Sequence, residues 1–150
     1  MSIGTANGRE GGQSIECVAI GTIRTPYRTT ADCPKTVHEN PQPCTLVLDP
    51  AFADGLLGLE RESHVLVLYW LDQARRDMLR RPARPDREEV GVFAIRSPMR
   101  PNPIAASVVP LVAVRGNEVD VVGLDCVDGT PLLDIKRAIF FDTEKGGKAV

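Results

Sequence analysis

The chain has 150 residues, of which 43% are hydrophobic and 25% charged, and its formal net charge is −2. This length suits one domain with its own core, and the charge argues against wholesale, salt-driven binding of nucleic acid. No apolar run approaches the roughly 20 residues of a membrane helix, and residues 1–14 lack the basic start and apolar stretch of a secretory signal. We therefore expect a cytoplasmic protein that makes no membrane contact.

Most of the chain resembles β-strands, because β-branched and apolar residues form short runs separated by Gly, Pro, Asn and Asp. The run 64–71 lacks alternation, which is typical of a central strand buried on both faces. The dipeptide Gly116-Asn117 predicts a tight hairpin turn. In chain order, we expect strands at 15–24, 44–48, 64–71, 91–95, 105–115, 118–124 and 131–136, with a last apolar run at 138–141.

Little of the sequence favours helix. One helical turn is expected within 51–59, and the segment 72–81 is the one candidate for a longer helix. About seven strands with little helix predict a mainly β fold, a single closed or nearly closed β-barrel, since closure removes exposed sheet edges. We expect this domain over residues 15–144, flanked by flexible tails at 1–14 and 145–150.

Several common kinds of site have no matching motif. The cysteines form no C-x-x-C pair, which disfavours a zinc knuckle and a dithiol redox site. A metal site of Cys33, His38 and Cys44 is conceivable, but we expect none. Neither a nucleophile elbow nor a glycine-rich phosphate loop is present, which disfavours hydrolase, Rossmann and nucleotidase functions.

The segment 96–104 is the strongest local signal for function. Three prolines fix their own φ angles and hold the residues before them in extended conformations. The loop should therefore be stiff before any ligand arrives. It presents Arg96, Arg100 and Asn102, which suits the capture of a carboxylate or phosphate at little entropic cost.

An arginine-rich segment precedes this loop, at Arg75, Arg76, Arg80, Arg81, Arg84 and Arg87. One interpretation is a solvated helix end and loop. The other is a phosphate-contacting patch that holds a structured RNA near the site, with Arg80, Arg81, Arg84 and Arg100 as RNA-binding residues.

Six blocks of sequence together resemble the TsaA-like (TrmO) family, in order and spacing, from about residue 15 to residue 136. They are the segments 20–27, 58–60, 63–64, 91–97, 100–104 and 125–136. The resemblance implies a single-domain short form of a β-barrel that binds S-adenosylmethionine, usually as a homodimer. It further implies a methyltransferase acting on N6 of N6-threonylcarbamoyladenosine beside the tRNA anticodon. Alternatives are methylation of a small metabolite or another RNA, and a non-catalytic module that binds or senses S-adenosylmethionine.

The resemblance also implies where the cofactor binds. The matching positions fall at four places, namely Pro34, Lys35 and Thr36; Asp72 and Gln73; Arg96 with Ala106; and Asp125, Cys126, Val127 and Asp128. Two of these places depart from the family pattern, which favours Pro-Arg-Gln at 34–36 and His-Gln at 72–73.

Chemistry assigns roles within this set. Arg96 suits the cofactor carboxylate, and the acidic residues suit hydroxyl or ammonium groups. Asp128 or Asp72 is a candidate to receive the acceptor's proton, whereas Asn102 either pins the loop or touches the substrate.

Overall fold

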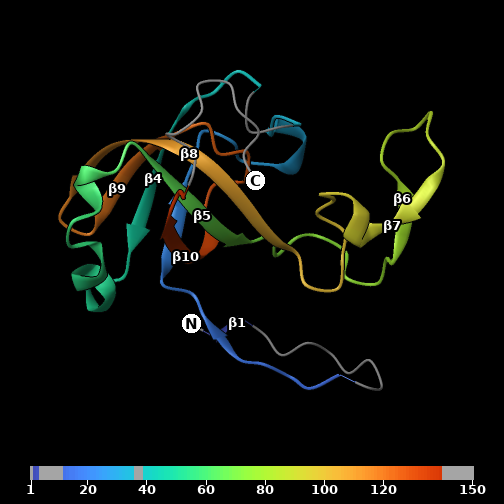
Figure 1. The fold of residues 1–150 in the computed structure, drawn as a ribbon, viewed down its shortest axis with the longest axis horizontal. Helices are drawn as coiled ribbons and strands as arrows, with labels where there is room; N and C mark the ends of the chain where they lie inside the picture. The colour runs from blue at the N-terminus through green and yellow to red at the C-terminus, as the bar shows by residue number, and fades with distance from the viewer. Residues whose placement is uncertain (1, 4–11, 36–38, 140–150) are drawn as a thin grey trace.

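A six-stranded antiparallel barrel forms the main body of the protein, on the left in Figure 1. The computed structural model describes residues 2–3, 12–35 and 39–139. The barrel order is β10-β3-β4-β9-β8-β5, which confirms the predicted closed barrel. Its strands are β3 (Gly21–Arg24), β4 (Pro43–Leu48), β5 (His64–Trp70), β8 (Ile104–Arg115), β9 (Glu118–Val122) and β10 (Thr130–Arg137).

Two short strand pairs lie outside the barrel. The strand β1 (Ser2–Ile3) pairs with β2 (Cys17–Val18), and β6 (Arg80–Pro82) pairs with β7 (Glu89–Gly91). The short 3₁₀ helices are η1 (Thr30–Asp32), η2 (Pro50–Leu56), η3 (Leu59–Arg61) and η4 (Val92–Ala94). No helix in the described part of the chain is long and apolar enough to cross a membrane. Residues 140–150 lie outside the described residues, so the C-terminal tail and part of the 138–141 run stay predictions.

The barrel interior is filled by the inward-facing side chains of alternating strand positions. Leu46, Val65 and Val119 are fully buried, and they meet side chains from the other barrel strands. The expectation that 64–71 is buried on both faces was wrong, because β5 alternates between buried and half-buried residues. A barrel wall has only one face in the core, so the outward residues Leu66 and Leu68 stay partly exposed despite being apolar. The strand β5 pairs with β8 and β10, but each strand of a closed barrel has two neighbours, so none is central.

Of three other predicted elements, two are confirmed and one is corrected. The hairpin of β8 and β9 is confirmed, with Gly116 in the left-handed region at φ 62°. One helical turn within 51–59 is confirmed by η2. The expected strand 15–24 is divided into β2, which pairs with β1, and β3, which pairs with β4 and β10 in the barrel.

Two predictions within 71–103, the segment between β5 and β8, were wrong. The segment 72–81 is a loop followed by β6 rather than a helix, and 91–95 is mostly η4 rather than a strand. Tertiary contacts override the intrinsic helix propensity of this segment. The Arg76 side chain donates a hydrogen bond to the Pro101 carbonyl, and residues 80–82 pair with 89–91. We call the segment 71–103 the arm. It extends away from the barrel in Figure 1.

Candidate functional site

One end of the barrel gathers the stretches that sequence analysis singled out for the cofactor. At this end β3, β5 and β9 finish, and β4, β8 and β10 begin. The β3–β4 connection contains Pro34 and Lys35, and the exit of β5 leads to 72–73. The arm returns through 96 to β8, and the β9–β10 connection contains 125–128. Because neighbouring strands of the barrel are antiparallel, alternate connections meet at the same end. We call this region the connecting end.

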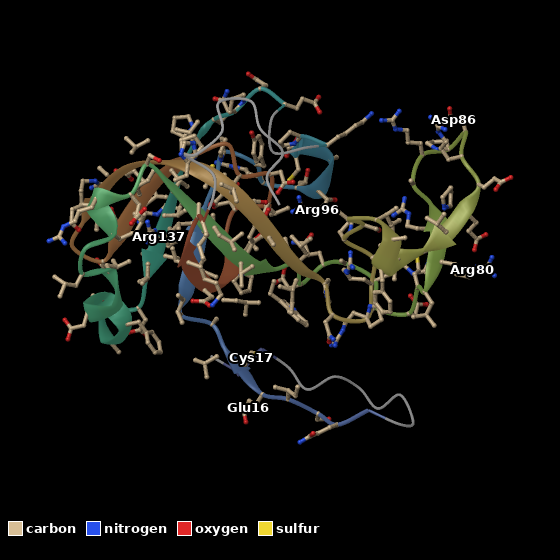
Figure 2. The ribbon with its side chains drawn as sticks, viewed as in Figure 1. Glu16, Cys17, Arg80, Asp86, Arg96 and Arg137 are labelled. Carbon is tan, nitrogen blue, oxygen red and sulfur yellow. The ribbon has the colours of Figure 1, made fainter. Side chains whose placement is uncertain are left out.

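Arg96 reaches from the arm back to the barrel. Its Nη2 donates a hydrogen bond to the carbonyl of Ala106 on β8. Ala106 lies opposite Leu68 in the β5–β8 ladder, two residues before β5 ends. Figure 2 labels Arg96 where the arm returns to the barrel. The structure thus joins two predicted cofactor residues, and it leaves the guanidinium exposed enough to meet an anion.

Asp125 enters the connecting end just after β9. Its carboxylate accepts a hydrogen bond from the hydroxyl of Tyr69, with 2.6 Å between Oδ1 and the tyrosine oxygen. The same hydroxyl lies 2.8 Å from Oγ of Ser107. Burial, followed by the charge of Asp125, raises the pKa of Tyr69. The phenol is therefore neutral at physiological pH and acts as a donor to the carboxylate.

Hydrogen bonds join the segment 125–128 to the residues that follow β3. Asp128 accepts the Thr25 amide at 3.0 Å through Oδ1, and its own amide donates to the Tyr27 carbonyl at 2.7 Å. The Thr25 hydroxyl donates to the Cys126 carbonyl at 2.8 Å. Gly129 follows with φ 84°, a left-handed conformation that favours glycine. Asp128 thus has a structural role in the turn, and a role in proton transfer stays a prediction.

The β3–β4 connection lies near the same carboxylate. Burial is the main cause of the raised pKa of Cys33, and the charge of Asp125 is the next cause. Pro34 is half-buried, and the exposed Lys35 donates its amide to Glu39 at 3.2 Å. Thr36 and His38 lie outside the described residues. Among the residues that are described, no group of three or more His, Cys, Asp or Glu side chains could hold a metal ion.

The base of the arm is held by a residue that sequence reasoning did not single out for this purpose. The Arg76 guanidinium lies 5.1 Å from the centre of the Trp70 ring. Its Nε donates to the Pro101 carbonyl at 2.8 Å, and its Nη2 donates to Oδ1 of Asn102 at 3.2 Å. The amide oxygen of Asn102 therefore helps to pin the proline loop. Asp72 and Gln73 stand exposed beside this base, directly after β5.

Arginines also hold the proline loop from within. Arg100 donates from Nη1 to the carbonyls of Ile95 and Ser97, both at 3.1 Å, and Arg81 donates to the Ser97 hydroxyl at 3.1 Å. Farther out, Arg80 lies 3.7 Å from a Glu89 carboxylate oxygen. Arg81 and Arg100 therefore have structural partners, and RNA contacts through them or through Arg80 stay predictions.

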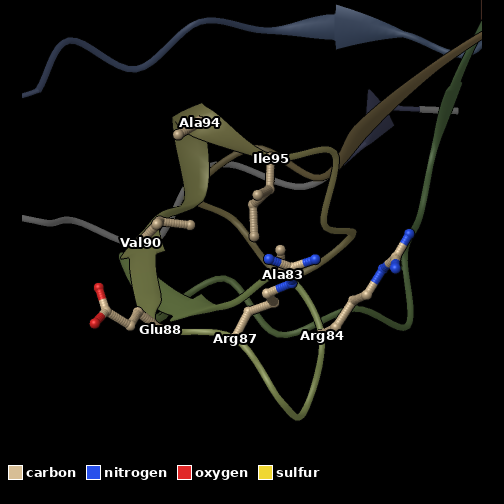
Figure 3. A pocket seen from close by; sticks show the side chains of 7 residues that line it. All are labelled: Ala83, Arg84, Arg87, Glu88, Val90, Ala94 and Ile95. Carbon is tan, nitrogen blue, oxygen red and sulfur yellow. The ribbon is translucent and has the colours of Figure 1, made fainter.

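The outer part of the arm contains an open hollow of about 600 Å³. Arg84 and Arg87 stand on one side of it and Ile95 on the other (Figure 3). Ala83, Glu88, Val90 and Ala94 complete the lining. Two guanidiniums beside apolar side chains match the chemistry of a nucleotide, with its phosphate and its base. This hollow keeps open the RNA interpretation of the arginine-rich segment.

Burial of Cys126 makes the stability of the folded protein depend on pH. Burial raises the pKa of its thiol from 9.0 to about 12. The unfolded chain loses this proton first, so the folded state binds more protons between these values and stability falls as pH rises. Between about pH 9 and pH 12, we expect Cys126 to lower the free energy of unfolding by about 1.4 kcal/mol for each pH unit.

Urea denaturation of wild type and Cys126→Ala at pH 8 and pH 10 measures this dependence. The variant should show a smaller loss of stability between the two pH values, while Tyr69 and Cys44 contribute to both proteins. Equal losses would contradict the role of Cys126.

The chain is similar to a known protein family and to several known proteins. The model of the tRNA-methyltransferase O N-terminal domain family matches residues 22–141. An S-adenosyl-L-methionine-binding protein of Archaeoglobus fulgidus is 41% identical over 118 residues, which cover 79% of this chain and 85% of the relative. The tRNA (adenine(37)-N6)-methyltransferase of Escherichia coli is 37% identical over 139 residues, covering 85% of this chain and 59% of the enzyme.

Among solved structures, the crystal structure of TrmO from Pseudomonas aeruginosa is similar, with a TM-score of 0.72 and 32% identity. The match covers 95% of this chain and 63% of that one. This chain therefore spans about three fifths of the length of both TrmO and the Escherichia coli enzyme.

Proposed function

The chain belongs to the tRNA-methyltransferase O N-terminal domain family, and on that premise we propose that it is an S-adenosylmethionine-dependent tRNA methyltransferase. The acceptor is N6 of N6-threonylcarbamoyladenosine beside the anticodon. The observation that carries the proposal is that Arg96, Ala106 and Asp125, which come from three separate segments, lie at the same end of the barrel. Arg96 bonds Ala106, and Asp125 bonds the Tyr69 hydroxyl that also contacts Ser107. The names of the similar proteins support both the cofactor and the class of reaction.

The residues at the connecting end fit S-adenosylmethionine chemically. The exposed Arg96 guanidinium offers a fork for the amino-acid carboxylate. Asp125 and Asp128 each have one carboxylate oxygen bonded to the protein, to Tyr69 and Thr25, which leaves their second oxygens to accept from hydroxyl or ammonium groups. When bound, S-adenosylmethionine supplies an electrophilic methyl group.

The chain's own contribution to the reaction is positioning and proton acceptance. Holding the acceptor nitrogen in line with the donor lowers the barrier by roughly 7–11 kcal/mol in favourable cases. The nitrogen gains a methyl group and loses its proton, and we assign the proton to the Asp128 or Asp72 carboxylate. Asp72 is exposed at the base of the arm, so its proton can pass on to solvent.

The arm is the proposed RNA-binding element. The Arg84 and Arg87 side chains at its hollow offer phosphate contacts on an otherwise acidic chain. Binding through them should weaken as salt rises. We further propose a cytoplasmic homodimer. The dimer is supported by exposed apolar side chains on the arm, which include Leu79 at 52% and Phe93 at 79% exposure.

Nucleoside mass analysis tests the proposed function. Purified protein is incubated with S-adenosylmethionine and two forms of one tRNA, with and without the threonylcarbamoyl group. We expect the modified nucleoside of the first form to gain one methyl mass, and the second form to stay unchanged. No gain in either form would contradict the tRNA proposal, and a gain confined to other nucleosides would reassign the acceptor.

A variant sharpens the same assay. Arg84→Ala should reduce methylation at moderate salt through a higher KM for tRNA, because a phosphate contact is lost while the barrel end is intact. Arg61→Ala, which removes an exposed arginine from η3, is the matched control. Its activity should equal that of the wild type.

A further inference from the structure

A series of hydrogen-bonded polar groups, Ser107, Tyr69 and Asp125, lies among the mostly apolar side chains near the connecting end of the barrel. Tyr69 is 1% exposed and Ser107 is 6% exposed. Among the described residues, Ser107 and Thr130 are the buried polar side chains, and the rest of the core cluster is hydrophobic apart from the Tyr69 hydroxyl. Burying such groups costs free energy unless they are hydrogen-bonded, so the presence of these polar groups in the core needs a physical explanation.

The register between β5 and β8 brings Ser107 and Tyr69 together. Ser107 on β8 lies opposite Val67 on β5, two residues before Tyr69. Residues two apart on a strand face the same side, so Tyr69 and Ser107 form a diagonal pair that points into the barrel. Tyr69 lies one residue before the end of β5, and its hydroxyl contacts both Ser107 on β8 and Asp125 just after β9.

The direction of the hydrogen bonds follows from the donors available. A carboxylate only accepts, so the single proton of the Tyr69 hydroxyl is committed to Asp125 at 2.6 Å. The tyrosine oxygen then accepts from the Ser107 hydroxyl at 2.8 Å. Both buried hydroxyls are satisfied, and one oxygen of the carboxylate is fixed. No hydrogen bond joins Oδ2 of Asp125 to another residue in the described part of the chain.

We infer that Tyr69 and Ser107 are positioning residues that set the Asp125 carboxylate for S-adenosylmethionine, an inference that rests on the proposed function. Asp125 is half-buried; the buried pair holds its Oδ1, and its Oδ2 accepts from a hydroxyl or ammonium group of the ligand. A carboxylate held in place before binding loses less rotational freedom on binding, which raises affinity. Tyr69 thus acts through Asp125 and not by touching the ligand itself.

A double-mutant cycle measured by titration calorimetry with S-adenosylmethionine tests this inference. Tyr69→Phe keeps the packed ring and removes the hydroxyl, and it should raise Kd about 10-fold, which corresponds to about 1.4 kcal/mol. In an Asp125→Ala background, the same change should alter Kd by less than about twofold, because the group it positions is gone. Ser107→Ala provides a second variant if Tyr69→Phe fails to fold, and it should raise Kd in the same background-dependent way.

Stability is separated from positioning by a control on the same strand. Val67→Ala shortens another inward side chain of β5 and should lower the free energy of unfolding without changing Kd. A purely structural Tyr69 would weaken binding equally in both backgrounds, and that result would overturn the inference. So would wild-type affinity in Tyr69→Phe and Ser107→Ala, or in Asp125→Ala.

Failure of the proposed function has a different signature. If the wild-type protein does not bind S-adenosylmethionine, the proposed function and the inference fall together, whereas the results above overturn the inference alone. Repeating the cycle with 5′-methylthioadenosine, which lacks the amino-acid end, identifies the donor. A preserved effect of Tyr69→Phe assigns a ribose hydroxyl, and a lost effect assigns the ammonium; both support the positioning role.

Discussion

Gly21→Ala is expected to lower the free energy of unfolding by about 3 kcal/mol. Gly21 begins β3 and pairs with Leu48 on β4. A Cβ at this position would overlap the Val47 carbonyl oxygen and lie 2.8 Å from the Leu48 Cα. All the nearest atoms belong to backbone, so no side chain can rotate away. The β3–β4 ladder, which helps to close the barrel, would have to open.

Gly55→Ala is the matched control for this substitution. Nothing lies within 4 Å of a Cβ added at Gly55, which is in η2. Its stability should change by less than about 1 kcal/mol, because a compatible Gly to Ala change acts mainly on the unfolded chain. Urea denaturation of the two variants and the wild type makes the comparison. Equal stabilities for Gly21→Ala and Gly55→Ala would contradict the described strand contact.

Arg96→Ala is expected to weaken S-adenosylmethionine binding about 10- to 100-fold. A hydrogen bond to a charged group contributes roughly 1.5–3 kcal/mol, which corresponds to that range of Kd. The side chain is exposed, and its one described contact is to the Ala106 carbonyl. Its removal should therefore leave the barrel folded. Equilibrium dialysis with labelled S-adenosylmethionine measures the change in Kd, and circular dichroism checks the fold.

Two further variants locate this effect. Arg96→Lys keeps the positive charge but loses the planar fork, so it should restore only part of the affinity. Arg137→Ala removes an exposed arginine that pairs with Glu62, away from Arg96 in Figure 2, and should bind as the wild type does. Equal losses in Arg96→Ala and Arg137→Ala would indicate a general charge effect rather than a binding site at Arg96.

The barrel could be predicted because its strands are marked locally. Short β-branched runs end at Gly, Pro or Asp, and the Gly116-Asn117 turn sets the β8–β9 register. The arm could not be predicted in the same way. Its residues 72–81 have good helix propensity, and what keeps them out of a helix is long-range. Arg76 bonds to Pro101 and Asn102, which are 25 and 26 residues away.

The candidate site divides along similar lines. Sequence resemblance selected the cofactor positions, and the topology accounts for why separate stretches share one barrel end. Tyr69 lies within the apolar run 64–71, which predicted only a buried strand, and its hydroxyl partner Asp125 is 56 residues away. A single polar atom inside an apolar run was the available signal, since buried tyrosine hydroxyls usually find a partner. Ser107 gave no signal of its own.

Titration calorimetry of the wild-type protein with S-adenosylmethionine tests the central claim most directly, namely that the connecting end binds this cofactor through Arg96 and Asp125. Saturable binding is predicted, with a Kd in the ~1 μM to 1 mM range common for enzyme substrates. The double variant of Arg96→Ala and Asp125→Ala should bind at least 100-fold more weakly. Absence of heat from the wild type, or an unchanged Kd in the double variant of a folded protein, would contradict the claim.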